Sequence, residues 1–308
     1  MPKFSFGKLW LSPMESVSDF GFRKLCYNHG ASFTWIEMLY ADAVARESNA
    51  TMQHIDSYEP AIPTGIQLLA SKPDVLKKAI DVIKEKMTKT TPFSNLSAID
   101  LNFGCPSPIV TQKGGGPALL KRTQRMKELL TTLKTAQMPC GVKIRLGLSK
   151  QDKHNKIYLR VLDIANTLGL DYMTVHPKIA SDSSQAPVDH AVLQEIIDHA
   201  TIPIVGNGFV TDGKSAQKLL RMGCSAVMIA RAAIGYPWIF EEIAAYLDSG
   251  SLPRKRTQEE YMTAWKTYEA TAKKYGTQQK FYEYHKKIFQ MRISGDMGYH
   301  APSRILNG

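Results

Sequence analysis

The chain has 308 residues, 44% of them hydrophobic, and a formal net charge of +11, which suits one large folded domain with a small addition. Four widely spaced cysteines without a Cys-x-x-Cys pair argue against a disulfide framework and a cysteine-based zinc site, and no other metal site is indicated. No apolar run approaches the roughly 18 residues that a membrane span needs, and no signal peptide is evident, so we expect a soluble cytoplasmic protein without a membrane partner.

Short apolar segments alternate with amphipathic stretches through most of the chain. Eight segments have the length of buried strands, at residues 9–14, 32–36, 62–69, 98–101, 142–146, 172–176, 202–205 and 226–230. Most are followed by helical patterns, at residues 72–86, 125–136, 158–168, 188–200 and 214–222. This order predicts an α/β fold, a (β/α)8 TIM barrel over residues 1–248. An open doubly wound sheet is the alternative, but its Gly-x-Gly-x-x-Gly loop after the first strand is missing.

The pattern changes after residue 248. Residues 249–253 have the composition of a linker, and residues 259–292 are helical in pattern with no evident strand. Residues 251–308 carry eleven Lys and Arg against five Asp and Glu, a net charge of +6. We therefore predict a small, basic, all-helical domain over residues 249–308 that binds RNA, although such helices are often only solvated faces packed on a barrel.

One cysteine stands out by its position. Cys105 follows an apolar strand within Asn102-Phe103-Gly104-Cys105-Pro106, and a glycine run at residues 114–116 then opens a helix. Cys26, Cys140 and Cys224 are interpreted as inert core residues. A thiol with a pKa near about 8.5 is mostly protonated at neutral pH, so Cys105 can donate a proton at the barrel mouth. A nucleophilic thiolate is the chemical alternative, but no histidine lies nearby in the sequence to activate it.

Polar residues interrupt the apolar pattern at the ends of later strands. If Val142 and Ile144 face the helices, Lys143 and Arg145 point into the barrel, and His176 ends the next strand. A bare buried cation costs several kcal/mol unless an anion meets it. An internal salt bridge or a surface strand end is one interpretation of these cations, and a bound anionic cofactor is the other.

The last two strands end in features typical of phosphate binding. Asn207 lies between Gly206 and Gly208, and Ala230 is followed by Arg231. Loops at these places in TIM barrels commonly bind phosphate, because glycine lets backbone N–H groups approach closely and arginine supplies the countercharge. Together with Lys143, His176 and the amides of Gln67 and Asn102, the residues at these strand ends predict a binding site for flavin mononucleotide (FMN). Taken alone, Gln67 could cap a helix and Asn102 could hold a turn.

Several of these motifs, in order over roughly residues 11–240, resemble the FMN-dependent tRNA-dihydrouridine synthases. The matching motifs are residues 11–19 with 22–23, Gln67-Leu68, residues 102–106, Lys143 with Arg145, His176, residues 206–208 and residues 230–240. The resemblance implies reduction of the C5=C6 bond of specific uridines in tRNA, with NADPH as electron donor, reduced FMN as hydride donor and Cys105 as proton donor. It also implies that the flavin is bound by Pro13, Met14, Gln67, Asn102, Lys143, His176, Asn207, Gly208, Ala230 and Arg231.

The chain departs from the family pattern after the sixth predicted strand. The family usually has His-Gly-Arg-Thr there, whereas this chain has His176-Pro177-Lys178-Ile179, and Lys178 cannot make the bidentate contacts of an arginine. We expect a monomer that contacts tRNA through Arg145, Lys178, Arg254, Lys255, Arg256, Lys286 and Lys287. Two alternatives stay open: a small-molecule FMN oxidoreductase of the dihydroorotate dehydrogenase type, and a non-catalytic barrel that binds RNA.

Overall fold

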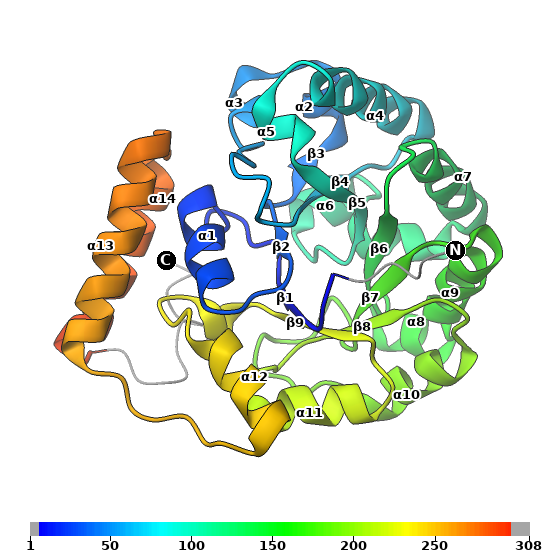
Figure 1. Ribbon diagram of the computed structural model, residues 1–308. Helices are drawn as coiled ribbons and strands as arrows, with labels where there is room; N and C mark the ends of the chain where they lie inside the picture. Colours follow the sequence, from blue (N-terminus) through cyan, green and yellow to red (C-terminus); the bar gives the residue numbers. More distant parts are fainter. Residues whose placement is uncertain (1–5, 297–308) are drawn as a thin grey trace.

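The computed structural model describes residues 6–296, in which parallel strands form a barrel ringed by helices (Figure 1). The strands are β1 (Leu9–Leu11), β2 (Thr34–Trp35), β3 (Leu39–Tyr40), β4 (Thr64–Leu69), β5 (Leu96–Phe103), β6 (Cys140–Arg145), β7 (Tyr172–His176), β8 (Ile204–Asn207) and β9 (Ala226–Ile229). They lie in the order β1-β9-β8-β7-β6-β5-β4-β2, and β3 pairs with β4 beside this path.

Backbone hydrogen bonds close the barrel between β1 and the segment that leads into β2. Leu11 N donates to Phe33 O at 2.8 Å, and Ser32 N donates to Leu9 O at 2.7 Å. The predicted TIM barrel is therefore confirmed, and each of its eight predicted strands overlaps an observed one. The open-sheet alternative is wrong because the two ends of the sheet meet. The two-residue β3 is an addition that the sequence did not predict.

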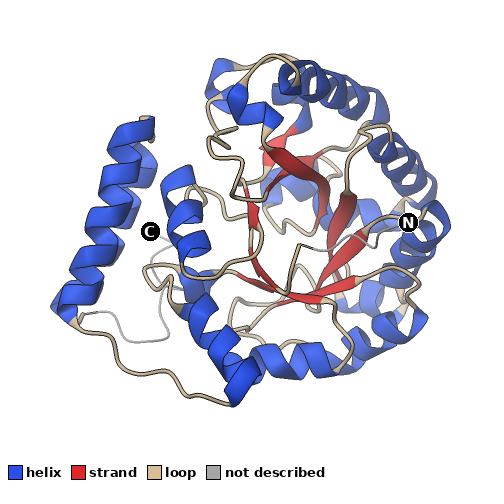
Figure 2. Ribbon diagram, viewed as in Figure 1, coloured by secondary structure: helices blue, strands red, loops and turns tan. Residues whose placement is uncertain are grey.

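Helices lie around the outside of the strands (Figure 2). Those of the barrel region are α1 (Phe20–Asn28), α2 (Ala41–Ala45), α3 (Asn49–Met52), α4 (Pro73–Met87), α5 (Thr91–Ser94), α6 (Pro108–Gln112), η1 (Gly116–Lys121), α7 (Thr123–Lys134), α8 (Lys150–His154), α9 (Ile157–Leu168), α10 (His190–His199), α11 (Gly213–Arg221), η2 (Arg231–Ala233) and α12 (Ile239–Ser249). Local sequence fixes several starts: Pro73 lies in the first turn of α4, and Asp212 forms a capping box with Ser215 at α11.

Aromatic side chains fill the lower part of the barrel interior. Trp10, Phe33, Trp35 and Tyr172 belong to one buried cluster, in which Trp10 and Tyr172 pack edge to face at 5.2 Å between ring centroids. Two glycines make room for these rings, because a Cβ on Gly65 would lie 2.3 Å from Trp35, and one on Gly141 would lie 2.3 Å from Tyr172. These rings close the lower end of the barrel.

Two further helices, α13 (Gln258–Tyr275) and α14 (Gln279–Ser294), lie outside the ring and pack beside α1 (Figure 1). They confirm the predicted helical region, whose last residues, 297–308, lie outside the described part of the chain. His285 of α14 is fully buried and bonds the loop after β1: its Nε2 lies 2.8 Å from Val17 O and 3.2 Å from Asp19 Oδ1. Across residues 6–296, the structure contains no helix with the length and apolarity of a membrane span.

Candidate active site

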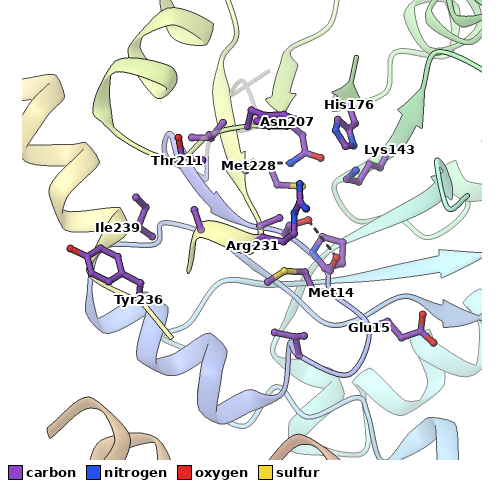
Figure 3. Close-up of a pocket in the computed structure, with 18 of the residues that line it drawn as sticks. Met14, Glu15, Lys143, His176, Asn207, Thr211, Met228, Arg231, Tyr236 and Ile239 are labelled. Carbon is purple, nitrogen blue, oxygen red and sulfur yellow. Dashed lines mark hydrogen bonds between the residues drawn. The ribbon is translucent and has the colours of Figure 1, made fainter. Parts of the chain in front are cut away.

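A cavity of about 870 Å³ opens at the carboxyl ends of the barrel strands (Figure 3). This volume lies in the upper part of the range typical of ligand sites, roughly 300–1,000 Å³. The strand ends and the loops that follow them supply most of its lining: Ser12 to Val17, Pro106, Lys143, Arg145, His176, Gln185, Asn207 to Thr211, Met228 and Ala230 to Ala232, joined by Tyr236, Ile239 and Arg292. In TIM barrels this face carries the active site.

Strand alternation brings three cationic or titratable side chains of β6 and β7 into the cavity. Val142 and Ile144 are fully buried against the helices, so Lys143 and Arg145 turn inward as predicted, and His176 lines the cavity beside them. Burial, together with the positive charge of Arg145, lowers the pKa of Lys143 to about 8. Burial together with Lys143 and Arg145 also holds the pKa of His176 well below 6.5, so its imidazole is neutral.

The loops after β8 and β9 form the opposite side of the cavity. Asn207 donates through Nδ2 to Met228 O at 2.8 Å, which ties the ends of β8 and β9 together. Gly208 has a φ of +111° and approaches His176 so closely that a Cβ there would lie 2.6 Å from the ring, which only glycine tolerates. Ala230 and Arg231 come directly after the end of β9 and line the cavity. Arg231 Nη2 donates to Ser184 O at 3.3 Å.

The donor set of this cavity fits an anionic, phosphate-bearing cofactor such as FMN. The positive charges of Lys143, Arg145 and Arg231 all act on His176, so the three cations face a common space. The backbone of Gly208 offers a close approach that a side chain would block. Pro13 and Met14 line the same cavity from the loop after β1. A flavin phosphate beside Arg231 and the ring system beside Lys143 and His176 would match these charges.

A chain of buried side-chain amides, Gln67 and Asn102, lies deeper in the barrel, and neither residue is part of the cavity lining. Gln67 Nε2 donates to Asp100 Oδ1 at 3.0 Å, and Asn102 Nδ2 donates to Gln67 Oε1 at 2.7 Å. Asn102 Oδ1 then accepts from the backbone N–H groups of Gly104, at 2.9 Å, and Cys105, at 2.7 Å. Asn102 therefore holds the turn after β5, which is one of the two roles that the sequence left open for it.

Cys105 is half-buried and directly precedes Pro106, which lines the cavity wall. Its loop is closed by Gly116, whose φ is +55° and whose Cβ would lie 2.7 Å from Cys105 O. Burial raises the pKa of the Cys105 thiol, and the charges of Glu15, Arg145 and Lys143, which all line the cavity, act on it. The thiol is therefore protonated at neutral pH, as a proton donor must be, and a nucleophilic thiolate is disfavoured.

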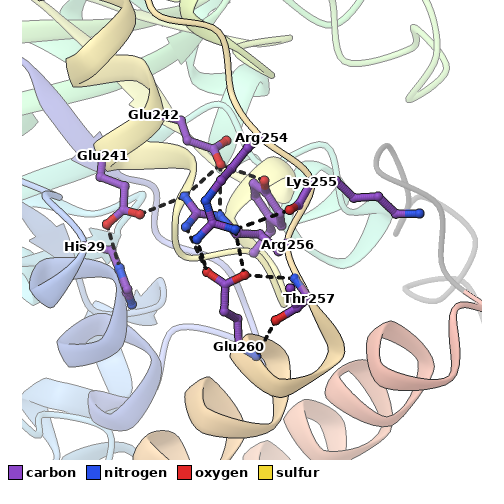
Figure 4. Close-up of polar contacts among 9 residues, drawn as sticks. His29, Glu241, Glu242, Arg254, Lys255, Arg256, Thr257 and Glu260 are labelled. Atoms are coloured by element: carbon purple, nitrogen blue, oxygen red, sulfur yellow. Dashed lines mark hydrogen bonds and ion pairs between the residues drawn. The ribbon is translucent and has the colours of Figure 1, made fainter.

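Two residues predicted to contact RNA have other partners. Lys178 is only 3% exposed, and its Nζ donates to Ser183 O at 2.7 Å beneath the ring of Phe209. Arg256, with a side chain 9% exposed, forms ion pairs with Glu241, Glu242 and Glu260 (Figure 4). The predicted tRNA contacts of Lys178 and Arg256 are therefore not supported, because both side chains are buried and bound to groups of the protein itself.

The other predicted RNA contacts remain accessible. Arg254, Lys255 and Lys287 are exposed, and Lys286 is half-buried on α14. Arg145 lines the cavity, where its Nη1 donates to Ile179 O at 3.1 Å.

Some residues of the site had no signal in the sequence. Arg292 of α14 reaches the cavity and donates to Ile234 O at 3.3 Å, although its helix lies more than 50 residues beyond the last strand. Glu15 places a carboxylate in the wall. Asp100 is fully buried behind the cavity, and only its two-residue spacing from Asn102 could have indicated that both side chains point into the barrel.

Solved structures with the same fold include oxidoreductases of low sequence identity. Morphinone reductase in complex with tetrahydroNAD superposes with a TM-score of 0.54 at 10% identity, covering 81% of this chain and 89% of that one. A variant of NCR from Zymomonas mobilis gives a TM-score of 0.51 at 12% identity, covering 81% of this chain and 89% of that one. These likenesses concern the barrel fold.

Sequence relatives are more specific. The tRNA-dihydrouridine synthase B of Klebsiella pneumoniae is 32% identical over 250 residues, which cover 80% of this chain and 74% of that protein. The tRNA-dihydrouridine synthase B of Escherichia coli strain K12 is 33% identical with the same coverage. The family model described as "Dihydrouridine synthase (Dus)" matches residues 10–300, nearly the whole chain. The chain therefore belongs to the dihydrouridine synthase family.

Proposed function

We propose that this protein reduces uridine in tRNA to dihydrouridine in the cavity at the top of the barrel, with FMN as its cofactor and NADPH as the electron donor. Family membership and the similarity to tRNA-dihydrouridine synthase B support dihydrouridine synthesis in tRNA. The observation that carries the site assignment is the meeting of Lys143, His176 and Arg231 in one cavity, with a protonated thiol at its rim.

Each cavity residue has a role toward the cofactor in this proposal. A bound flavin would supply the hydride that saturates the uracil C5=C6 bond. Lys143, cationic below its pKa of about 8, stabilises negative charge at the pyrimidine end of the flavin ring, and neutral His176 offers a hydrogen bond beside it. Asn207, Gly208 and Arg231 hold the phosphate, while Pro13, Met14 and Ala230 shape the walls.

Cys105 supplies the second hydrogen of the reduction in this proposal. The thiol keeps its proton at neutral pH because burial raises its pKa, and its loop is anchored by two backbone hydrogen bonds to Asn102. It gives this proton to the uracil carbon that does not receive the hydride, and the thiolate is then protonated again from solvent. Cys26, Cys140 and Cys224 are buried in the core, so none of them can replace it.

The substrate would approach across the basic surface of the C-terminal helices. Arg254, Lys255, Lys286 and Lys287 are available for phosphate contacts, which give affinity that falls steeply with salt. The target base would leave its stack to enter the cavity, because a uracil inside an RNA helix cannot reach the barrel mouth.

The test combines purification with mapping of modified RNA. We expect a yellow protein, and we expect a strain without this gene to lack one or a few dihydrouridines in its tRNA. The gene for wild-type protein restores them, whereas Cys105→Ala keeps the flavin but loses nearly all activity, and Cys224→Ala, a buried cysteine outside the site, stays active. A colourless protein, or tRNA of unchanged dihydrouridine content, would refute the proposal. Activity on dihydroorotate in place of tRNA would favour the small-molecule alternative.

A further inference from the structure

Asp100 is a fully buried carboxylate inside the barrel, beneath the cavity. It lies on β5 in register with Gln67 of β4 and Gly141 of β6. Its Oδ1 accepts from Gln67, and the hydroxyl of Tyr172 and the backbone N–H of Lys143 also act on the carboxylate as donors. No role is given to this group by the chemistry described above, although a buried carboxylate is costly to keep.

The carboxylate determines the direction of every hydrogen bond in the amide chain. Burial raises the pKa of Asp100 to about 7, so its carboxyl group is ionised above that pH. An ionised carboxylate only accepts, so Gln67 must turn its N–H₂ toward Asp100 and its oxygen toward Asn102. Asn102 must then use its N–H₂ on Gln67, which leaves its oxygen for the N–H groups of Gly104 and Cys105. The chain therefore transmits the orientation from Asp100 to the loop of Cys105 in three steps.

The same carboxylate also acts on the charge of Lys143 in the cavity wall. Its charge acts on Lys143 and raises the pKa of that ammonium against the opposing effects of burial and Arg145. The titratable groups that face Asp100 are Lys143, Tyr172 and Cys140, and those that face Lys143 also include Cys105 and His176. Asp100 is thus the carboxylate whose negative charge favours the cationic form of Lys143.

We propose that Asp100 is a positioning residue of the active site, which orients the Gln67 and Asn102 amides that anchor the Cys105 loop and keeps Lys143 cationic. The part that concerns Lys143 rests on the proposed function, in which Lys143 acts on a bound flavin. The anchoring of Cys105 depends only on residues of this chain.

An asparagine at position 100 cannot replace the carboxylate, although it has the same shape. If its oxygen faces Gln67, its N–H₂ faces the Lys143 N–H, and two donors oppose each other. If its N–H₂ faces Gln67, the Gln67 amide must reverse, and the reversal passes to Asn102, whose N–H₂ would then face the two loop N–H groups. In either orientation the substitution also removes the negative charge that acts on Lys143.

The first experiment measures alkylation of Cys105 by iodoacetamide in flavin-free protein, with modified cysteines identified by mass spectrometry. We expect Asp100→Asn to accelerate Cys105 alkylation by about fivefold, the factor that corresponds to one ordinary hydrogen bond. Asp163→Asn removes a charge from the exposed face of α9 and should leave the rate unchanged. Should Asp100→Asn fail to fold, Gln67→Met interrupts the same chain one step later and should accelerate alkylation equally. Wild-type rates in these variants would overturn the proposed anchoring.

The second experiment measures the pH dependence of flavin reduction by NADPH, followed as loss of visible flavin absorbance. Wild-type activity should fall as pH rises through the Lys143 pKa of about 8, and Asp100→Asn should move this fall to lower pH by about one unit. Tyr172→Phe keeps the amide chain but removes a donor from the carboxylate, so it should move the fall in the same direction without faster alkylation. An unmoved pH profile would overturn the electrostatic role. Wild-type protein that binds no flavin would refute the proposed function, whereas the alkylation rates would still decide whether Asp100 anchors the loop.

Discussion

Replacing Arg256 tests whether this arginine serves the fold or the RNA. Its guanidinium lies between α12 and α13, with Nη2 at 2.8 Å from Glu241 and 2.9 Å from Glu242, and Nη1 at 3.2 Å from Glu260 (Figure 4). It also lies over the ring of Trp238, 5.1 Å from the centroid. We expect Arg256→Gln to destabilise the protein and to change tRNA affinity little once the folded protein is compared.

The magnitude follows from which of the three partners is buried. Glu242 has a side chain 8% exposed, and removing the partner of such a buried charge costs about 3–5 kcal/mol. Glu241 is 42% exposed and Glu260 is 25% exposed, so each of these pairs adds roughly 1 kcal/mol or less. Tyr236 still donates to Glu242 at 2.8 Å in the variant, which places the loss near the lower end, at about 3 kcal/mol.

The assay is urea unfolding with tRNA binding measured in parallel. A loss of about 3 kcal/mol corresponds to a fall in melting temperature of roughly 6 °C for a chain of this size. The matched control is Arg254→Gln, because Arg254 is 62% exposed and its ion pair within residues 6–296 is with Glu260, so this variant should keep its unfolding midpoint. Wild-type stability of Arg256→Gln, with tRNA affinity lost at low salt, would show that the sequence-based interpretation was right.

Four other substitutions test the geometry of the barrel and the cavity. Gly141→Ala puts a methyl group 2.3 Å from Tyr172 and should cost about 3 kcal/mol in urea unfolding. Gly169→Ala, with no atom within 4 Å and a φ of +60°, should cost roughly 1 kcal/mol, and equal costs would contradict the packing argument. Phe209 has a backbone φ of +54° and a side chain 38% exposed. Asparagine tolerates this φ better, so we expect Phe209→Asn to raise the free energy of unfolding by about 0.5–1 kcal/mol. Lys143→Met should abolish the fall in the rate of flavin reduction above pH 8, because Lys143 is cationic below its pKa of about 8 and neutral above it. If the rate still falls above pH 8 in the variant, another group causes the fall.

The barrel could be predicted because its signal is local. Each strand is an apolar run bounded by turn residues, and the eight runs recur with helices between them. The approximate positions of these elements along the chain can therefore be predicted without knowledge of distant contacts. The inward direction of Lys143 and Arg145 also follows from the alternation of side chains along β6, with Val142 and Ile144 facing the helices. The Gly and Pro residues around Cys105 located its loop in the same way.

The roles of single cations could not be predicted, because a paired and an unpaired cation look the same in sequence. Arg254 and Arg256 are two residues apart, yet one is exposed and the other is enclosed by carboxylates from α12 and α13. Lys178 occupies the place of a family arginine, but carbonyl groups of its own loop hold its ammonium. Both outcomes depend on which acceptors the fold brings close, which no local pattern records.

The cavity also decides between the two interpretations of its inward cations. An internal salt bridge requires enough carboxylates to balance them, and the described residues supply Glu15 in the wall, Asp100 beneath it and Asp182, whose charge acts on Arg145. Against these stand four cations in the lining: Lys143, Arg145, Arg231 and Arg292. The lining therefore has a net positive charge that a bound anion would balance, and this charge adds to the effect of burial in keeping His176 neutral. A phosphate and a reduced flavin ring would supply negative charge at both ends of this cavity, which favours the cofactor site over an internal salt bridge.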